Sequence, residues 1–172
     1  MNQHTSKEAS EHRLSVSEVL KMLLSDGLIE KTEADALNAE VRIKRTVAHP
    51  LVVIAEQKWR SARKPFQPLT MDALGEWLAD RLKLEYFTID PLKVDFSSVT
   101  EVVSSAYATR FNSLAVQVNV TEVVFATAEP FLRDWEKEIS HITKKRIRRV
   151  IANPLDIARY LVEFYNLAQL SC

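Results

Sequence analysis

The pattern of apolar and polar positions changes about a third of the way along this 172-residue chain. The first third shows helical spacing only, with apolar residues three and four positions apart. The remainder alternates such stripes with short runs of β-branched and aromatic residues, which are typical of strands. This change predicts a helical N-terminal part followed by a mixed part that contains a sheet.

Three helices are predicted in the first part, at 15–25, 32–46 and 51–63. Ser15 or Ser17 is positioned to cap the first, and Gly27 follows it at a helix-stop position. Thr32 is the expected cap of the second helix, and Trp59 is expected on the apolar side of the third. The proline-containing connector 63–68 marks the predicted subdomain boundary.

The second part shows short strand-like runs between amphipathic stripes. The predicted elements are a helix at 70–82, a strand at 86–89, a helix at 99–111, strands at 114–118 and 122–126, a helix from Pro130, a strand at 145–152 and a helix capped by Asn153. The two middle strands are close enough to form a hairpin. The last helix is expected to bury an apolar stripe made of Leu155, Ala158, Leu161, Val162 and Tyr165.

These elements predict an α+β fold. An N-terminal helical subdomain is followed by a compact β-α-β-β-α-β-α module, whose small sheet is packed by helices. The predicted division is a disordered start at 1–14, a helical subdomain at 15–66 and an α/β subdomain at 67–172.

Composition narrows the classes of protein to which the chain belongs. Two glycines are too few for a glycine-rich phosphate loop, and neither Walker nor dinucleotide-binding patterns occur. The single cysteine, Cys172, excludes an internal disulfide and favours a reducing compartment. The polar start lacks the apolar core of a signal peptide, and no apolar run approaches the length of a membrane span. We therefore expect a cytoplasmic protein without direct membrane insertion.

Residue types that carry catalysis are present but not in catalytic arrangements. His4, His12, His49 and His141 show no metal-ligand spacing. The carboxylates near Trp135 lie on the polar side of a predicted helix, where solvation explains them. Serines occur without a nucleophile motif. The sequence thus predicts a protein that is not an enzyme and has no cofactor or metal.

The strongest charge feature is a basic run near the end of the chain. Its cations, and the candidate partner-binding residues, are Lys144, Lys145, Arg146, Arg148 and Arg149. Strand alternation places Arg146 and Arg148 on one face, with Ile147 and Arg149 on the other. Three interpretations remain open: an exposed edge strand protected by charge, docking on an acidic protein surface, and binding of phosphates in nucleic acid or a nucleotide.

Several segments together resemble the N-terminal domain, also called MshEN, of the GspE/PilB family of type II secretion and type IV pilus assembly ATPases. They are LGEWLADRL at 74–82, YFTIDPL at 86–92, YATRF at 107–111, ATAEP at 126–130 and ANPLDI at 152–157. The resemblance extends over roughly 15–170 and is strongest from Leu69 onward. Its motifs are typical of the fold, without a single diagnostic residue.

The resemblance implies a regulatory and docking domain. In the family this domain precedes an ATPase motor in the same chain and binds the cytoplasmic part of a GspL-like inner-membrane platform protein. That partner implies a cytoplasmic location, peripheral to the inner membrane. Nucleic acid is an unlikely partner on this interpretation, although the basic run keeps it as an alternative.

Some relatives bind cyclic di-GMP through two copies of a motif that begins Arg-Leu-Gly. The segment 19–29 resembles the first copy but has Glu18 and Leu20 in place of the arginine and the early glycine. The second copy, around 74–78, has Ala73 in the arginine position and Lys83 in place of the later glycine. These departures disfavour cyclic di-GMP, which remains the alternative ligand.

Overall fold

The computed structural model describes residues 11–170 and has an α+β fold, as predicted. Its elements are α1 Val16–Ser25, α2 Lys31–Lys44, α3 Pro50–Glu56, α4 Met71–Arg81, β1 Glu85–Tyr86, the 3-10 turn Pro91–Lys93, α5 Phe96–Val102, α6 Ser105–Phe111, β2 Ser113–Val118, β3 Glu122–Thr127, α7 Trp135–Thr143, β4 Arg146–Ile151 and α8 Pro154–Leu170. Residues 1–10, most of the start predicted to be disordered, lie outside the described residues, as does Cys172.

The first helix is defined by the residues that cap it. The Ser15 hydroxyl accepts the Glu18 N–H at 3.1 Å, which satisfies a backbone donor that has no partner within the helix. At the other end Gly27 has a φ of +72°, and the Gly27 and Leu28 amides donate to Leu24 and Leu23. This is a Schellman motif, whose left-handed position favours glycine. Both predicted ends are confirmed.

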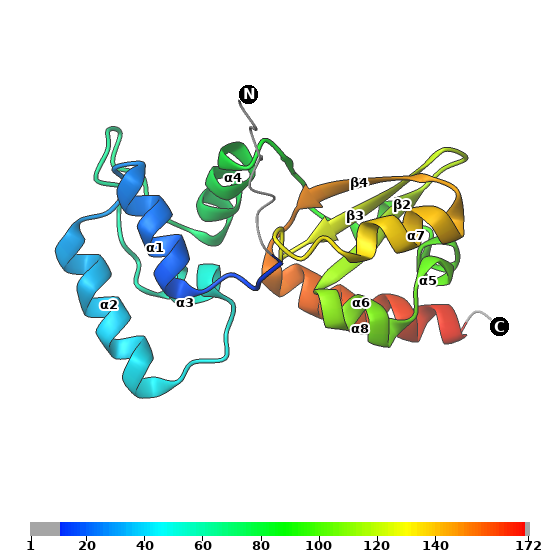
Figure 1. Cartoon of the computed structure of the whole chain (residues 1–172), viewed down its shortest axis with the longest axis horizontal. Coiled ribbons are helices and arrows are strands. Elements are labelled where there is room, and N and C mark those ends of the chain that lie inside the picture. Colours follow the sequence, from blue (N-terminus) through cyan, green and yellow to red (C-terminus); the bar gives the residue numbers. More distant parts are fainter. Residues whose placement is uncertain (1–10, 171–172) are drawn as a thin grey trace, which may run out of the picture.

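The sheet has the strand order β1-β4-β3-β2, with β4 parallel to both neighbours and β2 antiparallel to β3. The predicted hairpin is confirmed, and Asn119 stabilises its turn by accepting the Thr121 and Glu122 amides. Helix α7 covers one face, where Trp135 packs on Phe125 at 4.7 Å between ring centroids. Helices α5, α6 and α8 lie against the other face (Figure 1).

Two hydrophobic cores divide the described chain. One is formed by α1–α4 and includes Leu69, Leu74 and Leu78, and the other lies around the sheet. Helix α4 therefore packs with the helical half, although it follows the predicted boundary at residue 66. That the two parts are separate subdomains stays a prediction.

Backbone and side-chain contacts join the two halves. The Leu14 amide donates to the carboxylate of Glu129 at 2.8 Å, and the His49 Nε2 lies 2.7 Å from the Ala128 carbonyl oxygen. Phe131 packs against the helical core although it follows the sheet strand β3. The described end of the predicted disordered start is thus ordered, and Leu14 is buried.

Two predicted helix boundaries in the first half are wrong. Helix α2 begins at Lys31, before the predicted cap Thr32. Its N-cap is Glu30, whose backbone amide donates to the Glu33 carboxylate at 3.0 Å. The predicted helix 51–63 ends at Glu56, since Lys58 takes a positive φ and Arg60 pairs with Pro68. Trp59 is consequently outside the helix and packs against the first core from a loop.

Boundaries in the second half differ for similar local reasons. The predicted helix 99–111 is two helices, because Val103 is extended and Ser104 caps a new helix by accepting the Tyr107 amide at 3.1 Å. The helix predicted from Pro130 begins only at Trp135. The strand predicted at 86–89 is confined to β1, Glu85–Tyr86.

Candidate partner-binding surfaces

The predicted basic run begins at the end of α7 and continues along β4. Lys144 ends α7 in a left-handed conformation, with a φ of +57°, and β4 starts at Arg146. β4 pairs along its length with β3, but β1 pairs only with Val150 and Ile151. β4 is therefore an internal strand at Val150 and Ile151 but an edge strand along Arg146–Arg149. The interpretation as an exposed edge strand applies to this basic part only.

Carboxylates within the chain neutralise much of this run. Arg148 pairs with Glu122 at 2.5 Å and with Glu85 at 2.9 Å, and these contacts raise its pKa. Arg146 lies on the same face but is farther from Glu122, at 3.9 Å. Alternation along β4 correctly predicts that Arg146 and Arg148 share a face.

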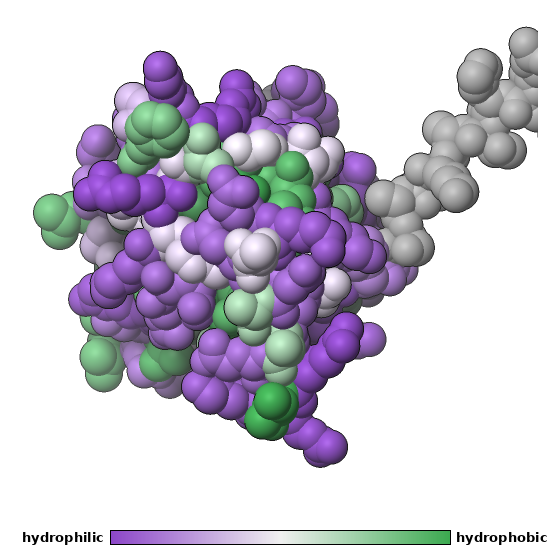
Figure 2. Space-filling view, turned by 90° about the vertical axis from the view of Figure 1, so that its left-hand side faces the viewer, coloured by the Kyte–Doolittle hydropathy of each residue, from purple (hydrophilic) through white to green (hydrophobic). Residues whose placement is uncertain are grey.

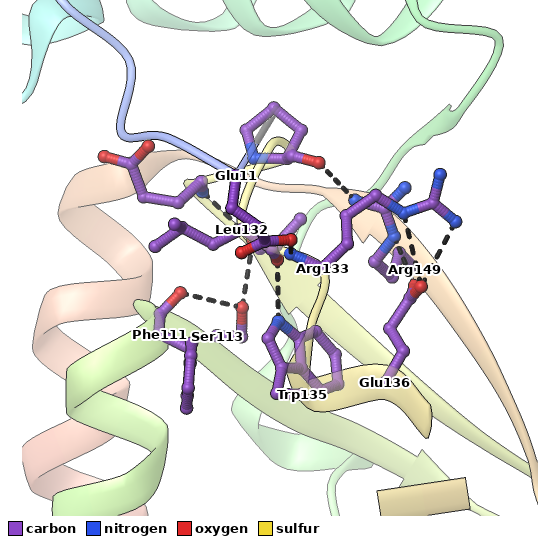
Figure 3. Close-up of polar contacts among 11 residues, drawn as sticks. Glu11, Phe111, Ser113, Leu132, Arg133, Trp135, Glu136 and Arg149 are labelled. Atoms are coloured by element: carbon purple, nitrogen blue, oxygen red, sulfur yellow. Dashed lines mark hydrogen bonds and ion pairs between the residues drawn. The ribbon is translucent and has the colours of Figure 1, made fainter. Parts of the chain in front are cut away.

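Arg149 has a structural position. Its side chain is 9% exposed, its Nε lies 2.6 Å from the Glu136 carboxylate, and it donates to the Pro130 carbonyl at 2.6 Å. In Figure 3 the side chains of Arg149 and Arg133 both reach the Glu136 carboxylate. Burial lowers the pKa of Arg149, which is the cost of removing a cation from water. This residue is therefore not available to a partner.

Three of the predicted partner-binding residues remain accessible. Lys144 and Arg146 are exposed, and Lys145 is half-buried. Neither lysine forms an ion pair with any residue in the range 11–170. The structure thus reduces the basic run from five cations to three that a partner could neutralise.

Helix α8 presents a second surface, which the sequence did not predict. Its buried stripe contains Ile157, Tyr160, Leu161 and Phe164. Leu155 and Val162, expected in the core, are 53% and 61% exposed, and Ala158 is exposed as well. The prediction that these three are buried is wrong, because the apolar part of α8 is wider than the surface that the sheet covers. A count of apolar positions around the helix would have revealed this width.

An apolar groove continues this exposed stripe toward the helical half. It has a volume of about 440 Å³ and lies between α3, the start of α4 and Leu155 of α8. Apolar side chains supply most of its wall, among them Val52, Ala55, Trp59 and Met71. Stripe and groove together form an α3–α8 surface suited to an apolar side chain of a partner.

The two segments that resemble a ligand-binding motif meet at a cavity of about 520 Å³ between the end of α1, the 61–69 loop and α4. Four cations line it: Arg63, Lys64, Arg81 and Lys83. Asp26 accepts hydrogen bonds from the Arg81 guanidinium at 2.5 Å and the Trp77 indole at 2.8 Å, which lower the pKa of its carboxyl. Two carboxylates, Asp26 and Asp80, line the cavity beside the four cations, so its walls carry a net positive charge.

The part of the chain that the structure describes contains no cluster of three or more His, Cys, Asp and Glu side chains that could hold a metal ion. Among the helices within 11–170, none combines the length and the hydrophobicity that a membrane span requires.

Comparison with known proteins identifies a family. The model of the MshEN domain matches residues 82–169, slightly more than half of the chain. The type IV pilus assembly ATPase TfpB of Acinetobacter baylyi is 33% identical over 152 residues, which are 87% of this chain and 26% of the relative. The chain thus spans about a quarter of that protein's length.

A solved structure of MshE with cdg has the same fold. It superposes with a TM-score of 0.59 over 89% of this chain and all of the matched chain, at 15% sequence identity. At this identity the likeness concerns the fold alone.

Proposed function

Because the chain belongs to the MshEN domain family, we propose that it is the non-catalytic docking and regulatory domain of a pilus or secretion assembly ATPase. Its partner is the cytoplasmic part of an inner-membrane platform protein. The motor that hydrolyses ATP belongs to the same polypeptide, as in the longer relative. The domain then works in the cytoplasm, held at the inner membrane by its partner.

The observation that carries this proposal is the α3–α8 surface. Exposed aliphatic side chains in a row beside an apolar groove mark protein interaction sites more often than isolated exposed residues do. Burying one such side chain contributes roughly 1.5–3 kcal/mol to binding. Lys144, Lys145 and Arg146 add a basic region that would favour an acidic partner surface and faster association.

Calorimetry with the cytoplasmic domain of the platform protein tests the proposal. We expect Val162→Asp to weaken binding at least tenfold, because it places a charge in the apolar contact. Leu92→Asp is the matched control, since Leu92 is 94% exposed and lies outside α8. Equal affinity of Val162→Asp and the unchanged chain, or an equal loss in the control, would contradict the α3–α8 surface as the docking site.

The basic residues are tested separately. Lys144→Gln with Lys145→Gln should slow association and reduce its dependence on salt, with little change in dissociation. Dissociation that accelerates instead would place these lysines inside the contact. Nucleic acid loses support as a partner, because Arg148 and Arg149 are already paired within the chain.

A second candidate function is cyclic di-GMP binding in the cavity between α1 and α4. Its motivation is that the two motif-like segments meet there beside four cations, and that the neighbouring structure of MshE was solved with cdg. Against it, the motif arginines are replaced by Glu18 and Ala73. Ligand at 100 times its Kd should stabilise the fold by about 2.7 kcal/mol, so an unchanged melting temperature at millimolar ligand would exclude this function.

A further inference from the structure

The end of α2 projects from the helical half as a basic and apolar tip, residues 42–47. In Figure 1 this end and the loop that follows it form the lowest point of the molecule. The tip contains Arg42, Lys44 and Arg45, and no acidic residue occurs from Val41 to His49. Glu40, one turn earlier, pairs with Lys44 at 2.7 Å. The tip and Glu40 together therefore carry a net charge of +2.

Two aliphatic side chains stand out from this cationic region. Ile43 is 83% exposed and Val47 is 102% exposed, so Val47 is held clear of the surrounding surface. Ile43 follows the buried Ala34 by nine residues, which places it on the opposite side of the helix. Figure 2 views the molecule from the side of the helical half and shows hydrophobic atoms next to hydrophilic side chains at its lower end.

The backbone fixes this arrangement. Arg45 takes a left-handed conformation, with a φ of +47°, and its amide closes α2 by donating to Val41. His49 then caps α3 by accepting the Leu51 amide at 3.1 Å. Hydrogen bonds thus hold the loop at both ends, and Val47 lies between them.

We propose that the α2 tip binds the surface of an anionic lipid bilayer, with Ile43 and Val47 entering the headgroup region. Basic residues near such a surface each strengthen binding about fivefold, and exposed aliphatic side chains add to this when they leave water. A convex tip with separate apolar side chains favours a bilayer over a protein, because lipids rearrange around it. A protein partner would have to supply matching sockets.

Co-sedimentation of the full chain with vesicles tests this proposal. We expect binding to vesicles of equal parts phosphatidylglycerol and phosphatidylcholine, and none to vesicles of phosphatidylcholine alone. Arg42→Gln with Arg45→Gln should weaken binding roughly 25-fold and remove most of its salt dependence. Ile43→Ser with Val47→Ser should weaken it about tenfold or more while the salt dependence remains.

Matched controls are available elsewhere on the surface. Lys93→Gln with Lys137→Gln removes two exposed cations, and Leu92→Ser with Val120→Ser removes two exposed aliphatic side chains. Both controls should bind vesicles as the unchanged chain does. Circular dichroism establishes that every variant is folded.

Absence of binding to the anionic vesicles by the folded chain would overturn the proposal. So would binding that the tip variants leave intact, or that the controls weaken as much. If the tip variants instead abolish only binding to the platform protein, the tip is a protein contact. That outcome differs from failure of the docking proposal, which rests on Val162 and the α3–α8 surface.

Discussion

Arg149 shows how one residue of a basic run differs from its neighbours. Its side chain is 9% exposed and is satisfied by Glu136 and the Pro130 carbonyl. We expect Arg149→Ala to reduce the free energy of unfolding by about 3 kcal/mol, because it leaves a partly buried carboxylate and a carbonyl unpaired. Arg146→Ala should change it by less than about 0.5 kcal/mol. Urea unfolding of both variants measures the difference, and equal values would contradict the structural position of Arg149.

Glu129 is a buried carboxyl whose pKa is raised by burial, against the hydrogen bond from Leu14 that lowers it. A raised carboxyl pKa means that the folded state favours the neutral form. Stability from this group is therefore present at low pH and is lost as the pH rises from about 4.5 through the raised pKa.

The prediction for Glu129 compares two substitutions. Glu129→Gln keeps an acceptor for the Leu14 amide without the charge. Its free energy of unfolding, relative to that of the unchanged chain, should therefore be higher at about pH 7 than at about pH 4. Glu129→Ala should cost about 1–3 kcal/mol at both, because the buried amide loses its acceptor. Denaturant unfolding at the two pH values measures this. A Glu129→Gln difference that does not vary with pH would contradict it.

At this scale the sequence predicts the face of the strand on which each side chain lies, but not its partner. Alternation separated Arg148 from Arg149 correctly. Their partners Glu122, Glu85 and Glu136 lie on three other elements, and only the folded sheet brings them to the cations. A local sequence pattern carries no information on such distant pairs.

At the scale of elements, helix α4 depends on the absence of a side chain at Gly75. A Cβ added there would lie 2.4 Å from Cε2 of the Tyr86 ring. The hydroxyl of Tyr86 donates to the Asp72 carboxylate at 2.7 Å. We expect Gly75→Ala to destabilise the chain by about 1–2 kcal/mol, because the ring must move. In a Tyr86→Ala background the same change should stabilise it by up to about 1 kcal/mol through helix propensity.

Thermal or urea unfolding of the four chains in this cycle provides the measurement. A stabilising Gly75→Ala in the otherwise unchanged chain would show that Tyr86 moves at little cost. The cycle isolates the contact because the helix propensity contribution is common to both backgrounds.

Helix ends were predictable where one local signal acted alone. Ser15, Thr70 and Asn153 cap helices as expected, and Gly27 ends α1. Thr32 and Pro130 carried the same kind of signal, but the helix starts predicted from them were wrong. Glu30 with Glu33 provided an earlier start for α2, and the Pro130 carbonyl is used by Arg149. Competing local signals and tertiary contacts decided these boundaries.

At the scale of the molecule, His49 contributes to the joint between the halves. Its Nδ1 accepts the Leu51 amide, so the proton lies on Nε2 and is donated to the Ala128 carbonyl. Burial lowers the pKa of His49, against this backbone hydrogen bond that raises it. The neutral ring is therefore the stable form, and stability from it is lost as the pH falls below about 6.5.

The expected consequence is lower stability in acid, because a protonated ring is costly to bury and its Nδ1 no longer accepts the Leu51 amide. His49→Asn keeps a helix cap but removes the contact to Ala128, so it should cost about 1 kcal/mol at about pH 7.5. This cost should shrink by about pH 5, where protonation weakens the unchanged chain as well. Urea unfolding at both pH values tests this, and a constant difference would contradict titration of His49 as the cause.

The fold class, the order of the strands along the chain, the hairpin and the family could all be predicted from the sequence. These follow from hydrophobic periodicity, turn residues and segment motifs, which act over a few residues. It takes the folded molecule to show that α4 packs with the helical core, that Arg148 and Arg149 are paired, and that Leu155 and Val162 of α8 are exposed. Each of these depends on which surface of a neighbouring element is present to cover a side chain. Periodicity shows that a helix has an apolar side, but the width of its partner decides how much of that side is buried.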